Sequence, residues 1–382
     1  MQESTIILLT MVSSIILVSF IMGITPYITR KNLNFGVMLP ERANLLPEVQ
    51  SWKKSFRGWS MALGAIGVLP LFGGFLLNLD EASLVNYMVI VGAITLVAIA
   101  FAQVVLYFHF HNKAKALKAE RFSAEEIKAD ARIMVSTNFR NEKVIISNKW
   151  LIIVGGLIIA VTALLPIIFY DQIPEHVPVN WNSTTATNFR SRSRQLFLLV
   201  PALQLGVLAL FIFANYSFKA TKQMLVPRNA KASTQQNRAY RYAMSKMIIA
   251  TGIGTMLIIS GLQMTMMLAT YDLPSFMIWV PILFSGLIII SLIYISFKYG
   301  QGGERYNPPQ AADNDHNIID DDAHWKWGMI YYNPNDPAVF VEKRFGIGTT
   351  FNFARWQAWA MIFGILVFVI ITMIIAFSMV DS

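Results

Sequence analysis

The chain has 382 residues, of which 55% are hydrophobic and only 14% are charged, and its formal net charge is +9. It contains no cysteine, which excludes disulfides, catalytic thiolates and thiolate metal sites. The excess of basic residues in so apolar a chain favours contact with anionic membrane lipids and not direct binding of nucleic acid.

Eight apolar runs follow one another along the sequence. Each is close to the roughly 20 residues that a helix rising about 1.5 Å per residue needs to cross a bilayer, and none contains an ionised side chain. We expect spans near residues 5–25, 59–78, 84–107, 151–170, 196–214, 247–269, 276–297 and 358–379. The predicted fold is an all-α polytopic membrane protein with about eight transmembrane helices.

The basic residues are confined to alternate connections between these runs. Of the 31 Lys and Arg residues, 28 lie in four connections, and the other three are in the 171–195 loop. The four basic connections are residues 26–58, 108–150, 215–246 and 298–357. Because cytoplasmic loops retain Lys and Arg, we expect these connections inside the cell and both chain termini outside. No basic residue precedes the first run, which favours a retained span over a cleaved signal peptide.

This topology divides the chain into five consecutive parts. They are an N-terminal three-helix membrane unit (1–107), a cytoplasmic basic helical connection (108–150), a four-helix membrane unit (151–297), a cytoplasmic linker with a hairpin (298–357) and a final span (358–382). The four-helix unit carries the only substantial extracellular loop, residues 171–195.

The first two basic connections have features suited to the membrane surface. Trp52 and Trp59 border the second span, where we expect tryptophan rings at headgroup depth. Ser123 and Glu126 have the spacing of a capping box and predict a short surface helix. That helix has two possible roles: a lipid-facing structural element or a docking site for a partner.

The last basic connection predicts a linker followed by a hairpin. Residues 301–323 are rich in Gly, Pro, Asn and Asp, which favours a flexible linker with a solvated acidic cluster over a cation site. The cluster comprises Asp313, Asp315, Asp320, Asp321 and Asp322. Next, residues 328–332 and 338–343 are β-prone and flank turn-forming residues 333–337. We expect these two segments to pair as a small cytoplasmic β-hairpin packed on the membrane-proximal surface.

Within the spans, the positions of prolines predict where helices could kink. Pro70, Pro166, Pro201 and Pro281 all fall in the outer half of their spans, where kinks would open an extracellular cavity. Ordinary irregularity of a helix bundle is the alternative. The absence of ionisable residues at the midplane disfavours ion-coupled transport. Gly252 and Gly254 predict close helix packing.

The 171–195 loop is the best candidate for ligand recognition. It mixes carboxylates, a histidine and a tryptophan with two prolines that favour an extended backbone. The ligand-facing residues that we predict are Asp171, Pro174, His176, Asn180 and Trp181. A single histidine is a weak metal signal, and His109 and His111 point to different faces of a helix. We therefore predict no metal, no cofactor and no catalytic residue.

Two stretches resemble known families. The series Asp171, Ile173, Pro174, His176, Asn180 resembles the extracellular IPxHxN motif of the bacterial SdpI-like membrane family, although Trp181, Asn182 and Ser183 replace its usual Gly-containing turn. A second stretch resembles a motif that precedes the final span of a related uncharacterised family. Its residues are Asn333, Pro334, Asp336, Pro337, Phe340, Val341, Lys343, Arg344, Phe345, Gly346, Gly348, Asn352, Phe353 and Ala354.

The resemblance implies a role in immunity at the bacterial cytoplasmic membrane, where a family member protects the cell from a secreted peptide toxin and signals to a repressor. We expect a non-enzymatic sensor that binds an extracellular peptide or lipid-like ligand and reports through the cytoplasmic motif. One alternative is a membrane enzyme or transport component for lipid-linked or peptide substrates, with Asp171, Glu175 and His176 as candidate groups. A structural partner of an export complex is another.

Overall fold

The computed structural model describes residues 3–122, 144–182, 185–222, 230–306 and 321–380. Within these ranges, eight helices are long and apolar enough to cross a membrane, which confirms the predicted fold. They are α1 (Glu3–Ile28), α2 (Pro47–Val68), α4 (Glu81–Arg121), α6 (Asn148–Ile168), α7 (Arg194–Ala220), α8 (Ala230–Met267), α9 (Ser275–Tyr299) and α10 (Trp356–Val380). The predicted surface helix near Ser123 and Glu126 lies outside the described residues, as do residues 307–320 of the predicted linker.

Several helices continue well beyond the apolar runs. α4 extends to Arg121, and its last turn carries Lys118 and Arg121, whose charge is favourable at a helix C-terminus. The predicted 215–246 loop is largely helical, because α7 ends at Ala220 and α8 begins at Ala230. Arg241 of α8 is buried, where its guanidinium donates to the carbonyls of Phe218 (2.7 Å) and Thr221 (2.9 Å) and so caps the end of α7.

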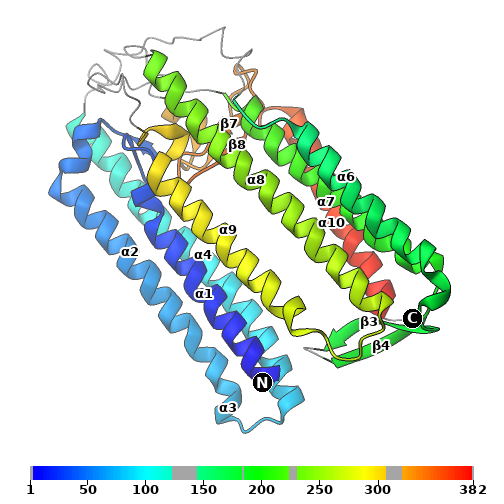
Figure 1. Ribbon diagram of the computed structural model, residues 1–382. Helices are drawn as coiled ribbons and strands as arrows, with labels where there is room; N and C mark the ends of the chain where they lie inside the picture. Colours follow the sequence, from blue (N-terminus) through cyan, green and yellow to red (C-terminus); the bar gives the residue numbers. More distant parts are fainter. Residues whose placement is uncertain (1–2, 123–143, 183–184, 223–229, 307–320, 381–382) are drawn as a thin grey trace.

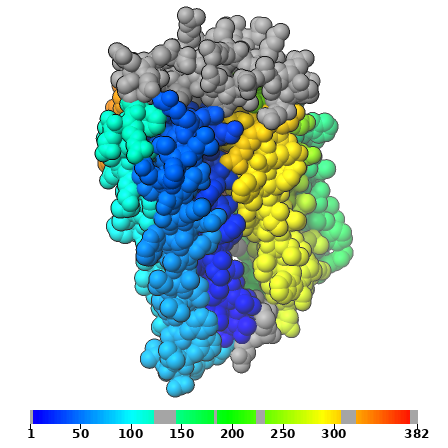
Figure 2. All heavy atoms as spheres, turned by 90° about the vertical axis from the view of Figure 1, so that its left-hand side faces the viewer, coloured from blue at the N-terminus to red at the C-terminus, as the bar shows by residue number. Residues whose placement is uncertain are grey.

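The helices form two packed units. α1, α2 and α4 pack against one another, as do α6, α7 and α8, while α9 packs on α8. Figures 1 and 2 show α9 beside α1, so that the two units are neighbours. Glycines permit the close approaches: a Cβ on Gly252 would meet the ring of Phe211, and one on Gly254 the ring of Phe284.

Buried glutamines within the spans hydrogen-bond to neighbouring helices, although the side-chain oxygens of Gln204 and Gln263 have no partner among the described residues. Gln103 accepts from the Ser60 hydroxyl (2.9 Å), while Gln263 donates to the carbonyl of Thr162 (2.7 Å). Gln204 donates to the carbonyl of Met256 (3.0 Å). Each amide therefore joins two helices of one unit, which is the usual role of such polar groups in a membrane.

The two ends of the bundle differ. The hairpin end carries β3 (His176–Asn182) paired with β4 (Thr185–Ser191), together with the start of α1 and the end of α10 (Figure 1). The opposite end, which we call the motif end, carries the motif of residues 333–354 and the other strand pairs, including β7 (Phe340–Glu342) and β8 (Thr349–Phe351). The arrangement therefore puts both chain ends on one side with the 171–195 loop. Assignment of that side to the exterior rests on the basic residues.

The predicted cytoplasmic hairpin is wrong in its strand pairing. Residues 328–332 do not pair with 338–343; instead β5 (Trp325–Lys326) pairs with β6 (Ile330–Tyr331), and β7 pairs with β8. Gly346 and Gly348 both have positive φ, which closes the β7–β8 turn at a place where most residues would be strained. A fourth small pair, β1 (Leu33–Asn34) with β2 (Val37–Met38), lies between α1 and α2.

Candidate functional site

The β3–β4 hairpin holds three of the five residues predicted to face a ligand, and the other two, Asp171 and Pro174, come just before it. Asp171, Pro174 and His176 are exposed around the start of β3, whereas Asn180 and Trp181 are half-buried further along the strand. The register of the pair shifts on both sides of Asn180. Such bulges re-aim side chains. The exposed face that a ligand can reach is therefore built from Asp171, Pro174 and His176.

The hairpin packs against α6, α7 and α8 of the four-helix unit. Ile173 and Val177 are buried in a cluster with residues of α7 and α8, and Trp181 packs against it. The Trp181 indole also donates to the carbonyl of Thr270 (3.3 Å), just after α8. Arg192 donates to the carbonyls of Tyr170 (2.8 Å) and Ile173 (2.6 Å). Trp181 thus serves as an anchor of the hairpin.

The ionisable side chains at the start of the hairpin do not interact with one another. No hydrogen bond or ion pair joins His176 to Asp171 or Glu175, all three of which are exposed. Across the described residues, no group of three or more His, Asp or Glu side chains is arranged to hold a metal ion. An acid–base pair would need these groups within hydrogen-bond reach of each other or of a shared substrate atom.

At the opposite end, residues 321–355 form a compact structure that we call the clasp. Its buried cluster comprises Trp325, Tyr331 and Val341. Phe345 points out of this cluster, and its ring lies 4.5 Å from that of Tyr107, 6.0 Å from Phe56 and 6.4 Å from Phe35. Phe35 stacks in turn on Phe110 at 5.2 Å. The side chain of Phe345 is thereby inserted among α2, α4 and the connection after α1, all in the N-terminal helix unit.

Arg344 is a buried charge in the clasp. Its side chain is 2% exposed, pairs with both Asp321 and Asp322, and donates to the carbonyl of Gly36 (3.0 Å). Burial alone would raise the pKa of the Asp322 carboxyl, but Arg344 and Lys118 together hold that pKa below its ordinary value. The prediction of a solvated acidic cluster is therefore wrong for Asp321 and Asp322, which neutralise a buried guanidinium. Asp313, Asp315 and Asp320 lie outside the described residues.

The clasp also contacts the second helix unit. Glu342 is buried, pairs with Arg30 after α1, and accepts from the Asn237 amide of α8 (3.2 Å). Gln301, just after α9, donates to the carbonyl of Gly348 and accepts from its N–H, at 2.8 and 2.9 Å. One short segment, 342–348, is thus bonded to both helix units. Lys343, by contrast, is exposed.

A turn at residues 333–337 completes the clasp. Asn333 accepts from the N–H of Asn335 (2.9 Å), and Asp336 from the N–H of Ala338 (3.0 Å), as expected for short polar side chains in turns. Pro334 and Pro337 lie within this turn. Buried Asn352 donates to the carbonyls of Asn333 (2.9 Å) and Asp336 (3.1 Å). The Asp336 carboxylate also accepts from the Lys222 ammonium (2.7 Å), which connects the clasp to the end of α7.

Glu304, beside the clasp, should make the stability of the fold depend on pH. Burial raises the pKa of its carboxyl from 4.5 to about 7, although Arg30, Arg305 and Lys31 oppose that rise. Between these values the folded state holds a proton that the unfolded state has released. The stability contribution is therefore present below about pH 4.5 and is lost as the pH rises through about 7. The partial exposure of the side chain limits the loss to about 2 kcal/mol or less.

Thermal unfolding between about pH 5 and 8 measures this contribution. We expect the purified chain to lose stability as the pH rises, and the Glu304→Gln variant to lose less over the same range. A wild-type protein that gains stability across this window, or a variant with an unchanged profile, would contradict the assignment.

Two pockets open near the motif end. One, of about 440 Å³, lies between α2 and α4; the other, of about 400 Å³, lies among α7, α10 and the β7–β8 pair. Neither is the cavity that the four span prolines predict beneath the hairpin. Pro70 does break its helix: it lies in a 3-10 turn (Leu69–Phe72) that ends α2, and its carbonyl accepts from the Tyr87 hydroxyl (2.9 Å).

The eight membrane-length helices define a multi-pass helical membrane protein. Residues 157–205, from α6 through the hairpin into α7, match DUF1648, a domain of unknown function. Residues 334–359, which hold most of the clasp and the start of α10, match DUF5808, a family of unknown function. Comparisons with curated proteins and with solved structures give no match. The two matches therefore coincide with the hairpin and the clasp.

Proposed function

We propose that this chain is an SdpI-like sensor or immunity protein of the bacterial cytoplasmic membrane. Its β3–β4 hairpin binds an extracellular peptide or lipid-like ligand, and its clasp reports the bound state to a cytoplasmic partner such as a repressor. The observation that carries the proposal is that the two family-matched segments lie at opposite ends of the same bundle (Figure 1).

The attachment of both segments to the four-helix unit supports communication between them. The hairpin packs on α7 and α8 and is hydrogen-bonded to the connection after α8. The clasp is hydrogen-bonded to α8 and to the ends of α7 and α9. Residues 342–348 also hold the N-terminal unit through Arg30 and the Phe345 cluster. A ligand that shifts the four-helix unit relative to its neighbour would therefore change the clasp, because the clasp contacts both.

The charge of the proposed outer side favours a cationic peptide. Outside the basic connections the chain has seven Asp and Glu residues against three Lys and Arg, a difference of −4. Long-range attraction of this kind speeds encounter and selects among ligands. Exposed His176 and Asp171 are the hairpin groups best placed to contact such a peptide.

A host lacking the gene, exposed to a panel of secreted peptide toxins, tests the proposal. We expect the deletion strain to be sensitive to at least one toxin and the wild-type chain to restore resistance. His176→Ala should reduce that protection at equal membrane abundance. Thr187→Ala, also exposed but on β4, is the matched control and should protect fully.

Trp181 needs a milder replacement, because its packing holds the hairpin. Trp181→Phe retains an aromatic ring and removes the indole donor to Thr270. Full protection by both the His176→Ala and Trp181→Phe variants would remove the hairpin as the binding site.

An enzyme or transport component remains the second candidate function, and a structural partner of an export complex the third. The hypothesis of a membrane enzyme is favoured only by the nearness in sequence of Asp171, Glu175 and His176. Metal that co-purifies with the wild-type chain and is lost from the His176→Ala variant would support it. Co-purification with a transporter ATPase would support the export complex.

A further inference from the structure

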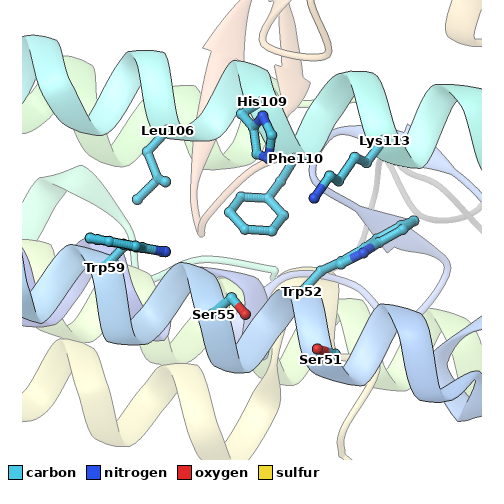
Figure 3. A pocket seen from close by; sticks show the side chains of 8 residues that line it. All are labelled: Ser51, Trp52, Ser55, Trp59, Leu106, His109, Phe110 and Lys113. Carbon is cyan, nitrogen blue, oxygen red and sulfur yellow. The ribbon is translucent and has the colours of Figure 1, made fainter.

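The groove between α2 and α4 at the motif end has a lining of mixed chemistry. Its volume is about 440 Å³, and residues of the two helices face each other across it (Figure 3). α2 contributes Ser51, Trp52, Ser55 and Trp59, and α4 contributes Leu106, His109, Phe110 and Lys113. These residues recur at intervals of three and four, so each set occupies one face of its helix. Two rigid elements therefore build the groove.

The groove crosses the boundary between hydrocarbon and headgroups that the sequence predicts. The second apolar run begins at Trp59 and the third ends at Tyr107, next to Leu106. Ser51 lies eight residues before Trp59, which is about 12 Å along a helix. The Trp59 side chain is 61% exposed, as expected for a ring at the membrane interface. One end of the groove is thus at acyl-chain depth and the other at headgroup depth.

The polar end of the groove offers a positive charge. Lys113 is exposed, with its ammonium 5.4 Å from the centre of the Phe110 ring. Among the residues that the structure describes, no carboxylate lies within ion-pair distance of Lys113, and no hydrogen bond engages the His109 ring. Ser51 and Ser55 also line the groove. A phosphate here would meet an ammonium and several neutral donors.

We propose that this groove binds the headgroup of one anionic glycerophospholipid. The phosphate lies against Lys113, with His109 and Ser55 as further donors, and the acyl chains pass over Trp59 and Leu106. Charge and depth select this occupant: anionic lipid is attracted by about 1 kcal/mol for each basic residue near the surface. The inference is independent of the ligand proposed for the hairpin.

The position of Phe110 gives the bound lipid a structural consequence. Its side chain lines the groove and also stacks on Phe35, which belongs to the aromatic cluster around Phe345. Lipid that fills the groove would hold Phe110 against this cluster and so stabilise the clasp. Anionic lipid should therefore raise the unfolding temperature of the chain more than zwitterionic lipid does.

Native mass spectrometry of the full chain in detergent tests the site, with phosphatidylglycerol and phosphatidylcholine as probes. We expect the wild type to retain one phosphatidylglycerol in preference to phosphatidylcholine. Lys113→Gln should weaken that binding about fivefold. Lys115→Gln removes the same charge from an exposed residue of α4 that does not line the groove, and it should leave this binding unchanged.

A second variant tests the groove without removing charge. Ser55→Trp fills the space from an exposed position on α2 and should abolish the preferential retention, while circular dichroism shows intact helices. Equal losses in Lys113→Gln and Lys115→Gln, or equal retention of the two lipids by the wild type, would overturn the proposal. Displacement of phosphatidylglycerol by inorganic phosphate at equal concentration would show a plain anion site and would also overturn it.

Discussion

Replacement of Arg344 by alanine is expected to lower the free energy of unfolding by about 3–5 kcal/mol. The guanidinium is buried and pairs with Asp321 and Asp322, so its removal leaves Asp321 without this counter-charge and Asp322 with only Lys118 of the two cations that hold it. The carbonyl of Gly36 loses its donor as well. Thermal unfolding of the purified full-length chain in detergent measures the loss, and limited proteolysis shows whether it begins at the motif end.

Lys343 provides the matched control for this prediction. It is the preceding residue and also basic, but its side chain is exposed, so Lys343→Ala should change stability by about 0.5 kcal/mol or less. Changing Asp321 to asparagine in the Arg344→Ala background should restore part of the stability, because the carboxylate that lost its ion-pair partner is then absent. Equal costs for Arg344→Ala and Lys343→Ala would contradict a buried ion-pair role for Arg344.

The second large effect is expected for Gly36→Ala. Gly36 has a φ of +78°, and a Cβ there would lie 2.3 Å from the Tyr107 hydroxyl oxygen and 2.6 Å from the carbonyl oxygen of Gly328. Left-handed backbone costs a residue with a side chain about 1–2 kcal/mol, and overpacking adds about 1–3 kcal/mol. We therefore expect a loss of about 2–5 kcal/mol.

The same substitution at Gly58 should have the opposite sign. Gly58 lies inside α2, its φ is not positive, and no atom lies within 4 Å of the position that a Cβ would take. Alanine is favoured over glycine in a helix by about 0.5–1 kcal/mol. Comparison of the two variants by unfolding midpoint tests the packing of the 35–36 turn on the clasp. A neutral Gly36→Ala variant would mean that this turn is not held against Tyr107.

The helices could be predicted from the sequence because each is marked by a local apolar run. The interior of the clasp could not, since its bonds join residues distant in sequence: Arg344 with Gly36, and Glu342 with Arg30. Composition gives the wrong prediction for the acidic cluster of the clasp. A run of aspartates is usually solvated, whereas Asp322 is partly buried against Arg344. A sequence pattern shows where polar groups are but not which buried charge they neutralise.

The hairpin was predictable in location and only partly in detail. Prolines and flanking spans predict an extended extracellular loop. They do not predict which of its proposed ligand-facing side chains are exposed and which are half-buried. His176 is exposed, whereas Trp181 is half-buried and donates to Thr270 after α8. The register shifts around Asn180 decide this division, and they depend on pairing with β4. Arg241 is a similar case: a residue of a basic connection is buried to cap α7.

We propose that the hairpin faces the outside of the cell while the clasp faces the cytoplasm. The chain contains no cysteine, so no native residue has to be replaced before single cysteines are introduced. Cysteines at the exposed positions Glu175 and Lys343 can then be labelled with a membrane-impermeant maleimide. In intact cells we predict labelling of the Glu175→Cys variant, and labelling of Lys343→Cys only after permeabilisation. The reverse pattern, or labelling of both variants in intact cells, would contradict the account.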